Sequence, residues 1–95
     1  MPTPHVTESV RALLSNALDA LDRLYDGKSE VVDVYSVLYA TGQALSDTEF
    51  FGLFEEAAGQ LHLVLRLNLS KVESRSRALD ATDRLRLALA EGPAA

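Results

Sequence analysis

The side chains best suited to binding chemistry lie around the first expected turn, in the stretch "LYDGKSEVVDVYSVLY". Asp19, Asp22 and Asp26, which lead into this stretch, recur at i, i+3 and i+7 and so share one helix face, and only Arg23 stands at the i+4 spacing that pairs with the first of them. Acids beside tyrosines suit the recognition of a basic protein surface, because charge speeds encounter and aromatic rings supply buried contact. The predicted partner-binding residues are Asp19, Asp22, Asp26, Glu30, Asp33 and Tyr39.

The same stretch has a second interpretation, in which it is only a solvated turn between two helices. In that case Tyr25 and Tyr35 belong to the hydrophobic core, and the acids are an ordinary solvent-facing surface. Both interpretations place a turn at Asp26 and Gly27. They differ in whether the surface has a partner.

Residues for catalysis or metal binding are few. Glu55 and Glu56 precede His62 by seven and six residues, so the Glu-x-x-His and His-Glu-x-x-His spacings of metal sites are absent, and His5 stands near the N-terminus. The stretch "ATGQAL" lacks the lysine of a phosphate-binding loop, and the serines at 70, 74 and 76 have no histidine nearby. We expect no enzymatic activity, no cofactor and no metal; a site of Glu55, Glu56 and His62 is the remaining alternative.

The charge of the chain disfavours nucleic acid as a partner. The net charge is −5, and the acids exceed the bases in residues 1–45 and 46–69 but not in residues 70–95. Arginines of the last segment alternate with acids and have no aromatic residue among them, which is typical of a solvated helix face. An acidic field repels phosphates and attracts basic proteins.

Size and composition predict one ordinary globular domain. The chain has 95 residues, 47% of them hydrophobic and 24% charged, and no cysteine. It contains no apolar run near the roughly 18–20 residues that cross a bilayer, and "MPTPHVTESV" does not resemble a secretory signal. We expect a soluble cytoplasmic protein with no membrane partner.

Hydrophobic periodicity predicts two helices before Gly42. The first follows Thr3–Pro4 or Thr7, carries apolar residues at i, i+3, i+4 and i+7, and ends at Asp26–Gly27. For the second, Ser29 is the expected N-cap and Gly42 the expected end.

Two more helices are predicted after Gly42. "LSDTEF" predicts a capping box of Ser46 and Glu49, and the next box pairs Ser70 with Glu73. Glycines 52 and 59 are expected to permit close helix approach. The last helix is expected to end at Gly92–Pro93, and Arg77, Asp80 and Arg84 to compensate one another along it.

The predicted fold is therefore all-α, an antiparallel four-helix bundle formed by residues 1–95, with residues 1–6 and 93–95 frayed. The segment "LHLVLRLNL" leaves one alternative open. Its leucines alternate, as in a half-buried strand, and they also continue the helical stripe that precedes them. An α+β fold with residues 61–69 as a strand is the minor alternative.

The stretch "LDRLYDGKSEVVDVYSVL" in this acidic, cysteine-free helical chain resembles the small bacterial immunity proteins that neutralise toxins. The resemblance covers mainly residues 18–38 and implies a basic protein partner, such as a toxin. The Tyr-Tyr-Pro element of the nuclease-colicin immunity proteins is not present, so no residue role is carried over.

Two functions are consistent with these observations. The first is an immunity-like or antitoxin-like module that neutralises a basic partner through the acidic helix-turn-helix face. The second is a structural or regulatory helical domain that self-associates as a homodimer, because Leu63 and Leu67 fall off the buried stripe if their segment is helical.

Overall fold

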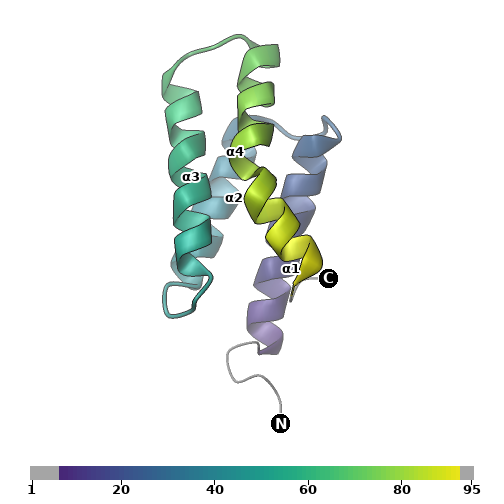
Figure 1. Ribbon diagram of the computed structural model, residues 1–95, viewed down its shortest axis with the longest axis vertical. Coiled ribbons are helices and arrows are strands. Elements are labelled where there is room, and N and C mark those ends of the chain that lie inside the picture. The colour runs from purple at the N-terminus through teal and green to yellow at the C-terminus, as the bar shows by residue number, and fades with distance from the viewer. Residues whose placement is uncertain (1–6, 93–95) are drawn as a thin grey trace.

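The computed structural model describes residues 7–92, and they form four helices joined by short turns (Figure 1). The helices are α1 (Glu8–Tyr25), α2 (Val31–Ala44), α3 (Phe51–Arg66) and α4 (Lys71–Glu91). This confirms the all-α bundle. The strand alternative for residues 61–69 is wrong, because α3 continues through Arg66. The start at Thr3–Pro4 and the fraying of residues 1–6 and 93–95 lie outside the described residues.

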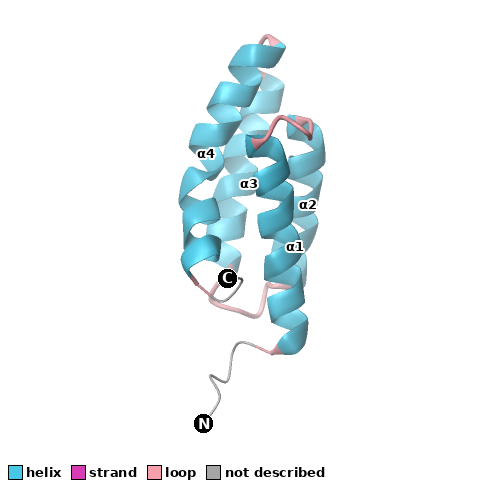
Figure 2. Ribbon diagram, turned by 90° about the vertical axis from the view of Figure 1, so that its right-hand side faces the viewer, coloured by secondary structure: helices cyan, strands magenta, loops and turns pink. Residues whose placement is uncertain are grey.

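Each helix packs against the next one along the chain, and α4 returns to pack against α1. The bundle is thus a closed ring of four antiparallel neighbours. Both ribbon views show that the hairpin of α3 and α4 extends beyond the turn between α1 and α2 (Figures 1 and 2). The two hairpins are therefore offset along the bundle axis, and one end of α3 and α4 has fewer neighbours.

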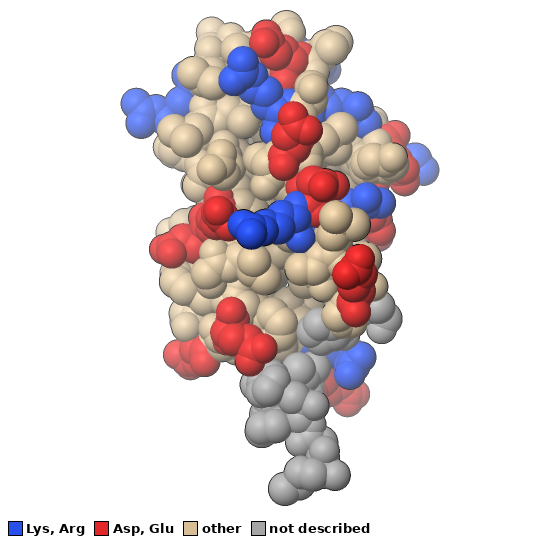
Figure 3. Space-filling view, in the orientation of Figure 1, with Lys and Arg blue, Asp and Glu red and all other residues tan. Residues whose placement is uncertain are grey.

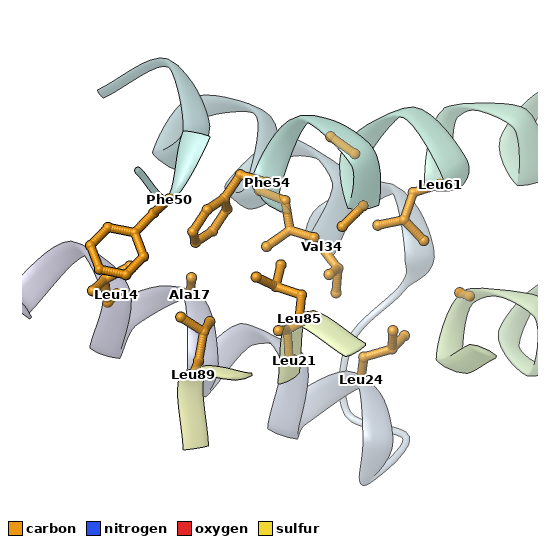
Figure 4. Close-up of a cluster of buried hydrophobic side chains, with 14 of the residues drawn as sticks. Leu14, Ala17, Leu21, Leu24, Val34, Phe50, Phe54, Leu61, Leu85 and Leu89 are labelled. Atoms are coloured by element: carbon orange, nitrogen blue, oxygen red, sulfur yellow. The ribbon is translucent and has the colours of Figure 1, made fainter. Parts of the chain in front are cut away.

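The core lies where α1, α3 and α4 point their apolar side chains toward one another, with α2 closing the remaining side (Figure 4). Phe54 is fully buried at its centre. The periodicity of the sequence identified most of this face, since leucines and alanines at i, i+3 and i+4 are the residues that become buried. The largest fully buried side chains are Phe54, Leu14, Leu21, Leu24, Leu38, Leu45, Leu61, Leu85, Leu89 and Val34.

Several predicted helix ends are confirmed by their hydrogen bonds. The Val10 amide donates to the Thr7 hydroxyl oxygen (3.2 Å), and the Glu73 amide donates to the Ser70 hydroxyl oxygen (3.2 Å). Each hydroxyl thus satisfies an amide that has no partner within its helix. Gly27 follows α1 with a φ of 76°, the left-handed conformation that favours glycine after a helix. Gly92 caps α4 as expected.

Three other predicted ends are wrong. The N-cap of α2 is Glu30, not Ser29, and no side chain caps this helix. The helix does not end at Gly42 but continues to Ala44, which brings Leu45 into the core. Ser46 does not cap α3, whose N-cap is Phe50.

The turn before α3 is held by Thr48 in place of the expected capping box. Its hydroxyl donates to the Leu45 carbonyl oxygen (2.7 Å) and accepts from the Phe50 amide (3.2 Å). A local hydroxyl that satisfies both ends of a turn removes the need for a cap at Ser46.

The glycine that permits close helix packing is Gly42. A Cβ atom on this residue would lie 3.0 Å from the Phe54 Cβ, so α2 and α3 touch where one of them has no side chain. The expectation for Gly52 and Gly59 is wrong, because a Cβ on either would meet nothing within 4 Å. These two glycines leave open space on the outside of α3.

Candidate functional site

Asp22, a predicted partner-binding residue, lies at the contact between α1 and α4. The Arg86 Nε donates to Asp22 Oδ1 at 2.8 Å, and the Arg86 guanidinium carbon lies 4.4 Å from the centre of the Tyr25 ring. Both the ion pair and the cation–π contact hold the same guanidinium. Tyr25 is exposed beneath it, so the expectation that Tyr25 belongs to the core is wrong, whereas Tyr35 is partly buried against the core.

Two more of the predicted acids have ion-pair partners at the surface. Asp19 pairs with Arg23 at 3.7 Å, as the i+4 spacing predicts, and Glu30 pairs with Lys71 of α4 at 3.8 Å. All four side chains are largely exposed, and such pairs are typically worth roughly 1 kcal/mol or less. Among the described residues, Asp26 and Asp33 have no ion pair.

The structure divides the predicted site between two faces of α2. Asp19 and Asp33 line one shallow hollow between α1 and α2. Tyr39 lines a different hollow, between α2 and α3. The predicted residues therefore do not form one surface, and Tyr39 belongs with residues that the sequence did not single out as partner-binding.

The segment of the chain from α2 to near the end of α3 is acidic and contains no lysine or arginine. Residues 31–65 include five acids, Asp33, Asp47, Glu49, Glu55 and Glu56. By contrast, Arg66 and α4 supply six of the nine basic residues of the chain. In Figure 3 only acidic side chains mark the lower left, over the turn between α2 and α3, whereas Lys and Arg lie mainly toward the upper part.

The α2–α3 hollow is an apolar depression of about 240 Å³ with an aromatic wall. The Tyr35 and Tyr39 rings stack with their centres 6.1 Å apart, and the His62 ring lies 5.8 Å from Tyr35. Both Gly42 and Gly59 line the hollow, and the open space outside Gly59 helps to keep it empty. The full lining is Tyr35, Leu38, Tyr39, Gly42, Gln43, Phe51, Phe54, Glu55, Ala58, Gly59 and His62.

Sequence reasoning missed most of this hollow, although a signal for it exists. Glu55, Gly59 and His62 recur at i, i+4 and i+7, and Tyr35 and Tyr39 at i and i+4, so each set shares a helix face. Recognising the hollow also requires knowing that these two faces meet. That information comes from packing.

The residues considered for a metal site are separated by the fold. Glu55 and His62 line the α2–α3 hollow, but Glu56 faces α4, where it pairs with Arg84 at 3.8 Å. Within residues 7–92 no three His, Cys, Asp or Glu side chains are placed to share a metal ion. Arg84 thus pairs with α3, and Arg77 pairs with Glu73 at 3.5 Å. The expectation that Arg77, Asp80 and Arg84 compensate one another is therefore wrong.

Arg75 has a structural role that the sequence did not reveal. Its Nη2 donates to the carbonyl oxygens of Leu24 (3.2 Å) and Tyr25 (2.5 Å), at the C-terminus of α1. The Leu24 carbonyl also accepts from the Gly27 amide (3.0 Å), and the charge of Arg75 suits the negative end of the helix dipole. Arg75 thus joins α4 to the end of α1.

The predicted self-association residues are exposed, as a helical segment requires. Leu63 is 57% and Leu67 54% exposed, and both line an open groove of about 540 Å³ between α3 and α4. The rim of this groove includes Arg77, Asp80 and Arg84. It is the second surface with an apolar lining that could bind another protein.

Comparison of the chain with protein-family models, with curated proteins and with solved structures finds no match. None of the described helices has both the length and the apolar character needed to span a membrane. The features of the surface that suggest a function are the acids of residues 31–65, a segment without lysine or arginine, and the aromatic hollow between α2 and α3.

Proposed function

We propose that this protein is a binding module for a basic protein partner, and that the acidic side formed by α2 and α3 is the surface that binds it. The observation that carries the proposal is the division of charge. Among the described residues no base pairs with Asp33, Asp47 or Glu55, whereas α4 provides partners for Asp22, Glu30 and Glu56. Acids without internal partners attract a basic surface most strongly.

The proposed surface differs from the one that was expected from sequence. Asp33, on the face of α2 toward α1, and Tyr39, on the face toward α3, border the exposed outer side of α2 within the proposed surface, and Asp47 and Glu55 extend it along the turn and α3. Asp22 has a structural partner in Arg86. The resemblance to immunity proteins makes a toxin the first class of partner to test, with binding that blocks it sterically and electrostatically.

The test is capture of partners from a lysate of the source cells by two variants of equal charge. The variant Asp33→Asn/Asp47→Asn removes two acids from the proposed surface, and Asp80→Asn/Asp83→Asn removes two from α4. A basic partner captured by the wild type and by the α4 variant is then purified. Its association with the α2–α3 variant should slow by roughly tenfold at low salt, since steering typically changes on-rates by about 10–1,000-fold.

The salt dependence provides the control. Association with the wild type should fall as salt rises, because exposed charges are screened beyond a Debye length of about 10 Å at 0.1 M. Equal association rates for the two variants would contradict the proposed surface. A partner with an acidic surface, or binding that salt leaves unchanged, would contradict the proposed chemistry.

Self-association is a second candidate function, favoured by the exposed leucines of the α3–α4 groove. Leu63 lies in α3 and Leu67, its C-cap, follows one turn later, and both line a groove of about 540 Å³. A homodimer would cover them. Sedimentation equilibrium of the wild type and of Leu63→Gln/Leu67→Gln tests this: a wild-type dimer that the variant loses supports it, and a monomeric wild type at high concentration removes it.

A further inference from the structure

We infer that the α2–α3 hollow is a receptor for a single arginine side chain of the basic partner, with the guanidinium stacked on the tyrosine rings and paired with Glu55. The inference rests on the proposed function, to which it adds the anchoring residue and its place. It depends on three observations: an arginine contact elsewhere in this molecule, the composition of the hollow, and its size.

The first observation is the Arg86 contact. There a guanidinium lies 4.4 Å from the centre of the Tyr25 ring while its Nε donates to Asp22 at 2.8 Å. A tyrosine face and a carboxylate together thus hold one arginine. Arginine suits this arrangement because its planar group stacks on a ring and still hydrogen-bonds at its edge.

The second observation is that the α2–α3 hollow has the same partners without the arginine. Tyr35 and Tyr39 supply stacked rings, and Glu55 supplies a carboxylate. Residues 31–65 contain no lysine or arginine that could occupy the place locally. Among residues 7–92, no ion pair engages Glu55. No lysine or arginine of the described residues lines the hollow, so a cation that binds there comes from another molecule.

The third observation is size. The hollow measures about 240 Å³, which is below the roughly 300–1,000 Å³ of sites for drug-sized ligands. A long side chain suits this volume better than a cofactor does. The apolar floor of Leu38, Phe54 and Ala58 would cover the methylene stem, while the polar end reaches the rim.

The experiment titrates short peptides into the full-length ¹⁵N-labelled protein and follows amide signals by NMR. The probes are acetyl-Gly-X-Gly-amide peptides in which X is arginine, lysine, citrulline or norleucine. Citrulline keeps the shape of arginine and removes its charge, and norleucine keeps only the stem. We expect the arginine peptide to shift the amides of Gly42 and Gly59, with at least roughly tenfold weaker binding of citrulline and norleucine.

Two variants locate the site. Gly59→Leu fills the hollow without changing the charge, and it should abolish the shifts. Gly52→Leu is the matched control, because Gly52 is on the same helix, is equally free of neighbours and does not line the hollow. Glu55→Gln should weaken the arginine peptide and leave norleucine unchanged, which separates the ion pair from the apolar contact.

The results that overturn the inference are specific. The first is that the arginine peptide shifts no amide signals, or only those of residues outside the hollow. The second is that the citrulline or norleucine peptide binds with the same affinity as the arginine peptide. The third is that the Gly59→Leu variant binds the arginine peptide like the wild type. The proposed function is tested separately, by capture that depends on Asp33 and Asp47. Loss of capture in that variant together with an unoccupied hollow would refute the arginine anchor and leave the acidic binding surface standing.

Discussion

The contact between α1 and α4 and the contact between α2 and α3 both contain tyrosines and acids, but only the first contains arginines. Arg75 reaches the carbonyls that end α1, and Arg86 lies between Tyr25 and Asp22. At the other contact, Gly42 and Phe54 bring α2 and α3 together through apolar atoms. Beside that contact, Tyr39 and Glu55 are exposed to solvent.

The difference shows how one small bundle separates stability from recognition. Arg75 and Arg86 of α4 engage the Tyr25 carbonyl and the Asp22 carboxylate of α1, so these polar groups have partners within the molecule. Since residues 31–65 contain no bases, the packing of α2 against α3 depends on shape, and the charges of Asp33, Asp47 and Glu55 are available for a partner. Substitutions at the two contacts should therefore differ in size and in kind.

The largest effect is expected at the apolar contact. Phe54→Ala should lower the free energy of unfolding by about 3–5 kcal/mol, because the ring is fully buried and its loss leaves a cavity. Urea denaturation measures the change. Phe51→Ala is the control, since this ring is only half-buried beside the hollow and should cost clearly less. Equal losses would mean that the contact does not depend on the Phe54–Gly42 pair.

The next largest effect is expected at Arg75. Arg75→Met keeps the aliphatic stem but removes the Nη2 hydrogen bonds to the Leu24 and Tyr25 carbonyls, at a cost of about 1.5–3 kcal/mol. Arg77→Met is the matched control on the same helix, where only an exposed i+4 pair with Glu73 is lost. Thermal unfolding of the two variants compares them. A loss as small as that of Arg77→Met would show that water replaces Arg75 at the end of α1.

The helices themselves could largely be predicted from sequence because their signals are local. Apolar spacing and the caps Thr7 and Ser70 act within one or two turns, and so does the Asp26–Gly27 stop. Ser29 and Ser46 failed as caps although they are typical cap residues. At the second site the hydroxyl of Thr48 holds the turn that Ser46 was expected to begin.

The candidate site was less predictable, since it depends on residues that are distant in sequence. Arg75 is separated from the Leu24 carbonyl by 51 positions, and Asp22 from Arg86 by 64, so no local pattern shows these contacts. In the sequence Gly42 is typical of a helix end, and only its contact with Phe54 shows that it is a packing residue within α2. The surface features that could be predicted need no knowledge of distant contacts: the charge imbalance of the segments, the Asp19–Arg23 pair and the exposure of Leu63 and Leu67.

Two alanine substitutions should isolate the cost of close approach between α2 and α3. Gly59→Ala should raise the free energy of unfolding by up to roughly 1 kcal/mol, since alanine favours the helix and its Cβ meets nothing within 4 Å. Gly42→Ala has the same helical gain, opposed by the 3.0 Å contact with the Phe54 Cβ. Overpacking typically costs about 1–3 kcal/mol, so the two variants should differ by about that amount in urea denaturation. Equal stabilities would mean that the helices separate without cost.

The smallest effect is expected at the Asp22–Arg86 pair, although its hydrogen bond is short. Both side chains are partly exposed, and such pairs contribute about 0.2–1 kcal/mol. A double-mutant cycle of Asp22→Asn and Arg86→Met should give a coupling energy in this range that salt reduces, while Arg86→Met in a Tyr25→Leu background reports the cation–π part. A coupling well above 1 kcal/mol would show that the α1–α4 contact excludes water more than its exposure indicates. An arginine held as firmly by Glu55 and the α2 tyrosines would then be a stronger anchor than a surface ion pair.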